Sequence, residues 1–158
     1  MQTMPVAEHV TDRAEARIGT LLRGKWRLER IVGVGGMATV LAATHRNKSR
    51  VAIKILHPEL AIDAEVTARF LREGYVANAV DHPGTAKVID DDVTDDGAPF
   101  LVMELLQGET LDARLERKGR LDTAEVLAVA NQILDVLEAA HERGVAHRDL
   151  KPENRFLT

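Results

Sequence analysis

The first part of the chain alternates hydrophobic and polar positions with a period near two, which is typical of β-strands. Five segments are predicted to be strands, at residues 26–32, 39–44, 50–56, 86–94 and 100–106; the first alternates imperfectly, and the last is a mostly apolar run typical of a buried strand. A glycine-rich run at 33–38 separates the first two, and Asp95-Asp96-Gly97 is a hairpin turn between the last two. Pro58 closes the third segment because proline cannot donate to a central ladder. The pattern predicts an antiparallel sheet.

Three segments instead have the spacing of amphipathic helices, at 63–79, 110–118 and 122–143. In the last one, Asp122 and Glu125 form a capping pattern and Gly144 is the stop signal. Its apolar positions cover an arc of about 180°, wider than the ~100° stripe of a surface helix. We therefore expect this helix to have neighbours on more than one side.

Composition narrows the class of protein. The 158 residues can form one domain that buries about 70% of its unfolded surface. A net charge of −4 without a basic block argues against nucleic acid as a partner, and no apolar stretch is long enough for a membrane segment. The lack of cysteine excludes disulfides and fits a cytoplasmic location. Residues 1–24 are predicted to be a flexible or weakly helical tail.

A group of chemically active residue types lies near the end of the sequence, at residues 147–154. Asp149 and Lys151 are two residues apart, so in an extended segment their side chains leave the same face. Pro152 keeps the segment a loop, and the Asn154 amide oxygen suits a hard cation. A base, a phosphate counter-charge and a metal ligand so close together predict phosphoryl transfer.

The glycine run at 33–38 is a weaker signal, since similar runs open dinucleotide-binding units and also occur in plain hairpin turns. A dinucleotide site needs a helix directly after the glycines. Here a strand follows, and the next distinctive residue is Lys54. Glycines let the backbone pass close to phosphates, with amide hydrogens directed at their oxygens. The run therefore favours a phosphate-binding loop.

Glu73 falls beside Val66, Phe70 and Ala77 on the helix predicted at 63–79. A carboxylate near an apolar stripe must be paired or shift its pKa, and Lys54 is the expected partner. The alternative is that Glu73 is a solvated surface residue. The acidic run at 90–96 lacks the spacing of a calcium loop, so a solvated hairpin is the preferred interpretation.

From about Leu22 to Thr158 these motifs, in this order, resemble bacterial eukaryotic-like (Hanks-type) serine/threonine protein kinases. Ala38 replaces the third glycine of the family's loop, and Lys151 fits the serine/threonine type. The resemblance implies an α+β fold, with an N lobe of antiparallel sheet plus one helix and a helical C lobe. It also implies ATP and Mg²⁺ as cofactors and a protein substrate with a Ser or Thr acceptor.

The resemblance also assigns roles to residues. Asp149 would accept the hydroxyl proton, Lys151 would neutralise the γ-phosphate, and Asn154 would bind Mg²⁺. The nucleotide would be held by Val32, Gly33, Val34, Gly35, Gly36, Met37, Ala38, Thr39, Val40, Ala52, Lys54, Glu73, Met103, Glu104, Leu106 and Phe156. Within this set Glu73 would position Lys54, and the backbone of Glu104 and Leu106 would contact the adenine edge.

The implied organisation is a tail at 1–24, an N lobe at 25–105, and a hinge with the first helices of an incomplete C lobe at 106–158. The sequence ends before an Asp-Phe-Gly motif, so we expect a kinase truncated after its catalytic loop, inactive alone or needing a complementing segment. A partner chain would then cover the helix at 122–143. The alternative is a catalytically dead fragment that serves as a nucleotide-binding or protein-interaction module.

Overall fold

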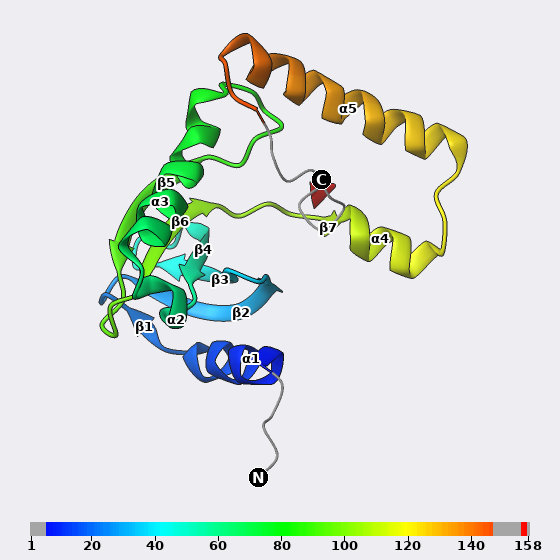
Figure 1. Cartoon of the computed structure of the whole chain (residues 1–158). Coiled ribbons are helices and arrows are strands. Elements are labelled where there is room, and N and C mark those ends of the chain that lie inside the picture. Colours follow the sequence, from blue (N-terminus) through cyan, green and yellow to red (C-terminus); the bar gives the residue numbers. More distant parts are fainter. Residues whose placement is uncertain (1–5, 147–155, 158) are drawn as a thin grey trace. The chain divides into compact units, whose positions relative to one another are not determined.

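The computed structural model describes residues 6–146 and 156–157 (Figure 1). Its strands are β1 (Leu21–Leu22), β2 (Trp26–Val34), β3 (Ala38–His45), β4 (Arg50–Leu56), β5 (Val88–Val93), β6 (Pro99–Glu104), β7 (Glu109–Thr110) and β8 (Phe156–Leu157). Its helices are α1 (Val6–Arg17), α2 (Pro58–Ala61), α3 (Ala64–Ala79), α4 (Leu111–Lys118) and α5 (Thr123–Glu142). The five longer predicted strands and the three predicted helices are all present.

The chain divides into two compact units, which we describe separately. The first runs up to Tyr75 and includes Lys87–Leu105, and the second comprises Val76–Ala86 and the chain from Leu106 onward. The first unit is built on a six-stranded antiparallel sheet with the order β1-β2-β3-β4-β6-β5. The predicted α+β class, an antiparallel sheet with a helix, is confirmed.

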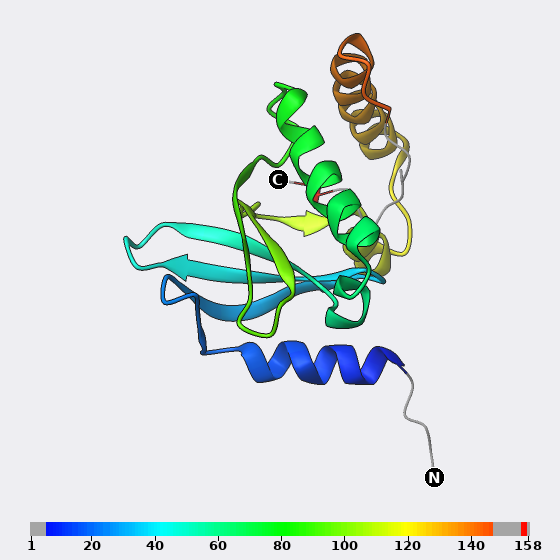
Figure 2. The same ribbon diagram turned by 60° about the vertical axis from the view of Figure 1, so that its left-hand side comes forward.

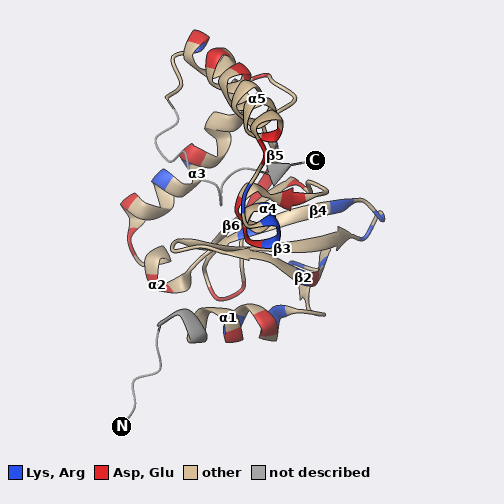
Figure 3. Cartoon of the chain, turned by 90° about the vertical axis from the view of Figure 1, so that its right-hand side faces the viewer, with Lys and Arg blue, Asp and Glu red and all other residues tan. Residues whose placement is uncertain are grey.

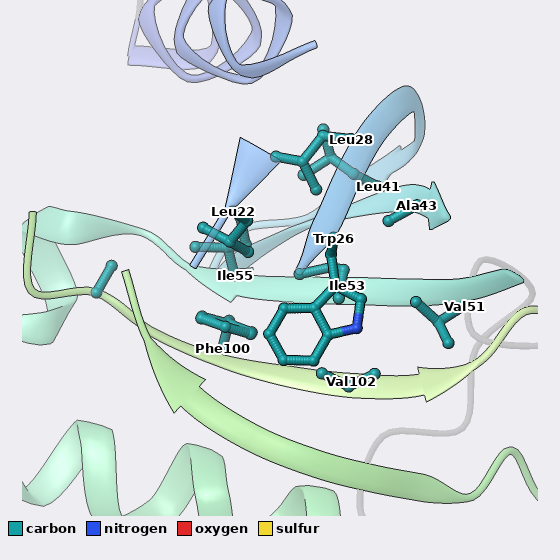
Figure 4. Close-up of a cluster of buried hydrophobic side chains, with 11 residues drawn as sticks. Leu22, Trp26, Leu28, Leu41, Ala43, Val51, Ile53, Ile55, Phe100 and Val102 are labelled. Carbon is teal, nitrogen blue, oxygen red and sulfur yellow. The ribbon is translucent and has the colours of Figure 1, made fainter. Parts of the chain in front are cut away.

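Burial on both faces of the sheet sets the orientation of β4. Its residues Val51, Ile53 and Ile55 belong to the larger hydrophobic cluster, in which Trp26 packs edge-on against Phe100 at 5.6 Å between ring centroids (Figure 4). Side chains alternate along a strand, so the intervening residues of β4 face the other way. The sheet therefore has two separate cores, one on each face.

Helix α3 covers the second face through a smaller cluster. Phe70 packs there with Leu56, Val88 and Leu101, and each of these side chains is at most 5% exposed. Gly74 lies one turn after Phe70, and a Cβ atom at this position would overlap the Leu101 side chain. The closeness of α3 to β6 therefore depends on the absence of a side chain at Gly74.

Residues 1–24 were predicted to be a flexible or weakly helical tail. Residues 6–17 do form a helix, α1, but together with β1 it packs as part of the first unit and is not a free tail (Figure 2). Leu22 is part of the larger cluster, and Ala14 of α1 is 3% exposed. Arg13 donates to Glu59 of α2 at 2.5 Å. These contacts leave no apolar pattern in the sequence, because α1 buries only a narrow surface and its polar residues make part of the contact.

The acidic hairpin is not simply solvated, because basic residues near the amino end contact it. Arg17 donates to Asp96 at 2.9 Å, and Arg23 lies 3.3 Å from both Asp92 and Asp95. Figure 3 shows charges of both signs along α1. The hydrogen bond from Thr94 and the pairing with Arg17 lower the pKa of the Asp96 carboxyl. The run at 90–96 therefore helps to hold α1 and β1.

In the second unit, helix boundaries follow the predicted signals. Asp122 caps α5 with a full capping box that includes Glu125, and Gly144 follows the helix with a φ of 71°.

Hydrogen bonds from Arg117 and Arg114 lower the pKa of Glu109 to about 2. Strand β7 pairs with β8, a two-residue ladder that the sequence pattern did not predict.

Helix α5 contacts the segment Val76–Ala86 within the same unit. His82 Nε2 lies 2.9 Å from Asp135, and Arg143 donates to the Ala79 carbonyl at 2.6 Å. Three apolar side chains of α5 are exposed, with Val126, Leu127 and Leu134 between 50% and 61% exposed. Among the described residues, no helix is both long enough and apolar enough to span a bilayer.

We expect acid to weaken the docking of α1. The hydrogen bond from Arg13 lowers the pKa of Glu59 from 4.5 to about 2, so the pair stabilises the fold above pH 4.5 and is lost as the pH falls toward 2. Because the Glu59 side chain is 60% exposed, the contribution is at most about 1 kcal/mol. Urea unfolding at pH 7 and pH 3 should show a difference between the native chain and Glu59→Gln that shrinks at pH 3. An equal difference at both pH values would contradict this assignment.

Replacing Gly74 tests the close approach of α3 to β6. At an exposed helix position Gly→Ala adds about 1 kcal/mol of stability, but overlap with Leu101 should reverse the sign and cost about 1–3 kcal/mol. Denaturant unfolding of Gly74→Ala, Leu101→Ala and the double variant gives the coupling between the two positions. We expect the double variant to lose less free energy of unfolding than the two single variants lose together. If the losses simply add, the two residues do not interfere.

Candidate functional site

Two rows of side chains cross the sheet on the face that α3 covers. Directly paired residues share a face, and the register aligns Val40 with Lys54 and Leu101, and Ala42 with Ala52 and Met103. Ala52 has only a methyl group, while Val40, Lys54 and Met103 stay partly exposed. The structure therefore brings together four predicted site residues, Val40, Ala52, Lys54 and Met103, on one surface.

The glycine-rich loop connects β2 to β3 at one end of these rows. Gly33, Val34, Gly35 and Gly36 are all exposed, and Cβ atoms at Gly33 and Gly36 would meet nothing within 4 Å. The loop closes through a hydrogen bond from the Gly35 amide to the Ala38 carbonyl at 2.9 Å. Val32 precedes the loop and is partly buried. Backbone in this part of the loop is open to a ligand.

The last three predicted loop residues differ in where their side chains lie. Ala38 belongs to the smaller cluster and Met37 packs against it, so both point toward the core under α3. Thr39 points to the opposite face, where it lines a cavity of about 20 Å³ together with Ala14 of α1. Only the backbone of Thr39 can therefore take part in the site. The cavity has room for about one water molecule and is not a nucleotide site.

His57 is a residue of this region that the sequence analysis did not single out. It follows β4 directly and is 8% exposed. Its backbone amide donates to the Met37 carbonyl at 2.8 Å, and its ring Nε2 lies 2.8 Å from the Gly35 carbonyl. No local sequence pattern announces these contacts, because His57 and Gly35 are 22 positions apart. His57 thus joins the end of β4 to the glycine loop.

Lys54 extends toward α3. Its Nζ atom lies 5.9 Å from the centroid of the Phe70 ring, over the aromatic face. A cation in this position interacts favourably with the ring quadrupole. The ammonium group thus lies beside the smaller cluster and on the same face as Ala52 and Met103.

The expectation that Glu73 lies on or near the buried stripe of α3 is wrong. Its side chain is 65% exposed, and its carboxylate lies 3.9 Å from Arg69 Nε, one turn earlier. The packed face of α3 extends from Phe70 toward Gly74, and glycine adds nothing to a hydrophobic pattern. The packed face predicted from the apolar residues alone therefore included Glu73, whereas the packed face in the structure includes Gly74. A Lys54–Glu73 pair stays a prediction.

Glu104, whose backbone is predicted to contact the adenine edge, is the last residue of β6. The Glu104 amide donates to the Lys87 carbonyl at 3.0 Å, and the Lys87 amide donates to the Glu104 carboxylate at 3.1 Å. Because the Glu104 amide has this partner, its carbonyl is the backbone group that could accept from a base. Leu106 belongs to the second unit, where it is partly buried.

The predicted catalytic residues Asp149 and Lys151 and the predicted metal ligand Asn154 lie outside the described residues. Phe156 is described through its backbone, which pairs with Thr110 in the β7–β8 ladder. Within residues 6–146, no three His, Asp or Glu side chains converge in a way that could hold a metal ion. The metal-binding prediction for Asn154 is therefore untested by this geometry.

Comparisons with known proteins agree on one family. The family described as "Protein kinase domain" matches residues 26–158. The serine/threonine-protein kinase PknA of Mycobacterium tuberculosis is 39% identical over 147 residues, which cover 90% of this chain and 34% of PknA. Pkn3 of Myxococcus xanthus, also a serine/threonine-protein kinase, is 37% identical over 145 residues, covering 91% of this chain and 26% of Pkn3.

Solved structures show the same likeness. The PknI kinase domain of Mycobacterium tuberculosis superposes with a TM-score of 0.70 and 31% identity, covering 89% of this chain and 58% of that domain. The chain thus spans about a quarter to a third of the curated relatives' length and a little over half of the solved kinase domain. The family match at residues 26–158 includes the glycine loop and Lys54.

Glu73→Gln tests where this carboxylate lies. Since Glu73 is exposed, we expect the free energy of unfolding to change by less than about 0.5 kcal/mol in urea titrations at pH 7. Glu109→Gln is the matched control and should lose more stability, because Arg114 and Arg117 both donate to that carboxylate. A loss of about 3–5 kcal/mol for Glu73→Gln would instead mark a buried, paired charge.

Proposed function

This chain belongs to the protein kinase family, and we propose that it carries the nucleotide-binding elements and catalytic loop of a serine/threonine protein kinase. Such an enzyme transfers the γ-phosphate of ATP to a Ser or Thr hydroxyl. One observation carries the proposal. The strand register aligns Lys54 with Val40 and places Ala52 and Met103 beside them on one face, next to an open glycine loop.

The first unit has features that fit a nucleotide. Ala52 leaves room for a flat base where a larger side chain would block it, and Val32, Val40 and Met103 offer apolar contacts around that room. The adenine edge would bond to the Glu104 carbonyl and the Leu106 backbone, with Phe156 as a further apolar wall. Backbone amides of the open loop would contact the phosphates.

Two charged side chains have assigned roles at the phosphates. Lys54 would contact the α- and β-phosphates through its ammonium group, as the corresponding lysine does in the family. Glu73 would position Lys54, which requires the exposed carboxylate to exchange Arg69 for Lys54 when nucleotide is bound. An exposed ion pair contributes about 0–1 kcal/mol, so this exchange has a small cost.

The catalytic loop would perform the transfer. Asp149 would accept the proton of the substrate hydroxyl while the hydroxyl oxygen attacks the γ-phosphorus. The bond between the γ-phosphorus and the bridging oxygen then breaks, and that oxygen leaves with ADP. Lys151 neutralises charge on the transferred group. Asn154 would hold Mg²⁺, which when bound neutralises charge on the phosphates. The acceptor is proposed to be Ser or Thr because the Lys at position 151 matches the serine/threonine type.

A second candidate is a module that binds nucleotide, or a protein partner, without phosphate transfer. The exposed apolar residues of α5, Val126, Leu127 and Leu134, favour it, since such a surface is typical of protein contacts. The partner chain predicted for residues 122–143 would cover this face. The two candidates share the nucleotide site and differ in chemistry.

Binding and transfer can be measured separately. A fluorescent ATP analogue should bind the chain, and Lys54→Met should weaken binding about 10- to 100-fold, the loss of one charge-assisted contact. Lys25→Met is the matched control, because Lys25 lies over the Trp26 ring on the opposite face and should leave binding unchanged. Equal affinity of Lys54→Met and the native chain would remove the assigned role of Lys54.

Transfer is followed with labelled ATP, Mg²⁺ and a generic basic protein. Phosphate on Ser or Thr that disappears in Asp149→Asn supports the kinase, and binding without incorporation above background supports the second candidate. If the native chain binds no ATP analogue at millimolar concentration, both candidates fail as nucleotide-binding functions.

A further inference from the structure

The contacts of His57 point to a task beyond packing. His57 is the N-cap residue of α2, yet its side chain makes no capping hydrogen bond to that helix. Its ring instead reaches the Gly35 carbonyl at 2.8 Å. A carbonyl oxygen only accepts, so Nε2 must carry the hydrogen. His57 therefore uses its side chain to hold a loop 22 positions earlier in the chain.

We propose that His57 is a positioning residue that holds the glycine-rich loop in its phosphate-binding conformation through the Gly35 and Met37 carbonyls. The proposal concerns loop geometry directly, and its consequence for nucleotide affinity rests on the function proposed above. Met37 and Ala38 anchor the far end of the loop in the smaller cluster, whereas Gly33, Gly35 and Gly36 have no side chains that could fix the segment before them.

The geometry of the peptide bond explains how the restraint acts. In a trans peptide the C=O of one residue and the N–H of the next point in opposite directions. Fixing the Gly35 carbonyl toward His57 therefore turns the Gly36 amide away from His57. His57 lines the cavity beside α1. The Gly36 amide is thus directed away from His57, in a part of the loop that is exposed and open to a ligand.

Two anchors are stronger than one for a flexible loop. The His57 backbone amide holds the Met37 carbonyl and the ring holds the Gly35 carbonyl, both at 2.8 Å. Between them Gly36 has little freedom left, so less conformational entropy is lost when a phosphate binds. His57 is 8% exposed as a whole residue, and a hydrogen bond that is partly shielded from water is stronger than an exposed one.

The test compares two substitutions that separate the hydrogen bond from the packing. His57→Phe keeps a ring but removes the donor, whereas His57→Gln keeps an N–H donor at a similar reach. His45→Phe is the matched control, because His45 lies at the other end of β3 beside Trp26. Amide hydrogen exchange over residues 33–40 without nucleotide reports the loop, and the fluorescent ATP analogue reports affinity.

We expect His57→Phe to speed exchange in the loop about 2- to 13-fold and to weaken nucleotide binding by a similar factor, which corresponds to one net hydrogen bond. His57→Gln should stay within about twofold of the native chain in both measurements, and His45→Phe should leave the loop unchanged. Unchanged loop exchange in His57→Phe overturns the proposal. Equal damage in His57→Gln and His57→Phe also overturns it, because ring packing would then be the cause.

A measurement on the native chain needs no substitution and holds if a variant does not fold. Nitrogen NMR shifts of the His57 ring should show the Nε2-protonated tautomer with a slowly exchanging ring proton. An Nδ1-protonated neutral ring would overturn the proposal. If the native chain binds no nucleotide while the loop exchange responds as expected, the proposed function fails and the role of His57 in loop geometry stands.

Discussion

The register of β4 is the constraint on which the rest of the first unit depends. Val51, Ile53 and Ile55 fill the larger hydrophobic cluster, so Lys54 must face the opposite side of the sheet. A slip of one residue would place the lysine ammonium in that cluster, where an unpaired charge costs several kcal/mol. Pairing with β3 on one side and β6 on the other reinforces the same register. The hydrophobic core thereby determines the position of Lys54. Among the described residues, Lys54 is the one positively charged site residue that a strand contributes.

The glycine loop shows a different situation, because only its last residues, Met37 and Ala38, pack against the core. Its exposed glycines make no side-chain contacts, and the hydrogen bond between Gly35 and Ala38 closes the turn without orienting it on the sheet. The anchors come from the residue after β4, so the same strand that presents Lys54 also leads to His57. Phosphate recognition by backbone amides needs such preorganisation, because a loop that reorients on binding loses affinity.

Ion pairs help to hold the amino-terminal part of the chain to the rest of the first unit. Arg13, Arg17 and Arg23 each reach acidic residues between 46 and 79 positions later in the chain. Pairs of this exposure contribute little one by one, and together they add to the burial of Ala14 and Leu22 in holding α1 and β1 to the first unit. A pattern of apolar residues cannot reveal docking of this kind, since the partners are polar and distant.

The sequence by itself determined the order of the five longer strands and of helices α3, α4 and α5, the α5 cap at Asp122 and the residue types of the site. Alternation, capping and glycine turns act over a few neighbouring residues, so they can be recognised in the sequence. The sequence also determined that Ala52 and Lys54 share a face, since they are two positions apart in a strand. Only the tertiary structure decided that α3 packs through Gly74 and leaves Glu73 exposed, and that His57 holds Gly35. These outcomes depend on how closely segments that are far apart in the sequence approach each other in space. A single glycine or histidine adds nothing to a hydrophobic pattern, so the sequence gives no sign of that approach.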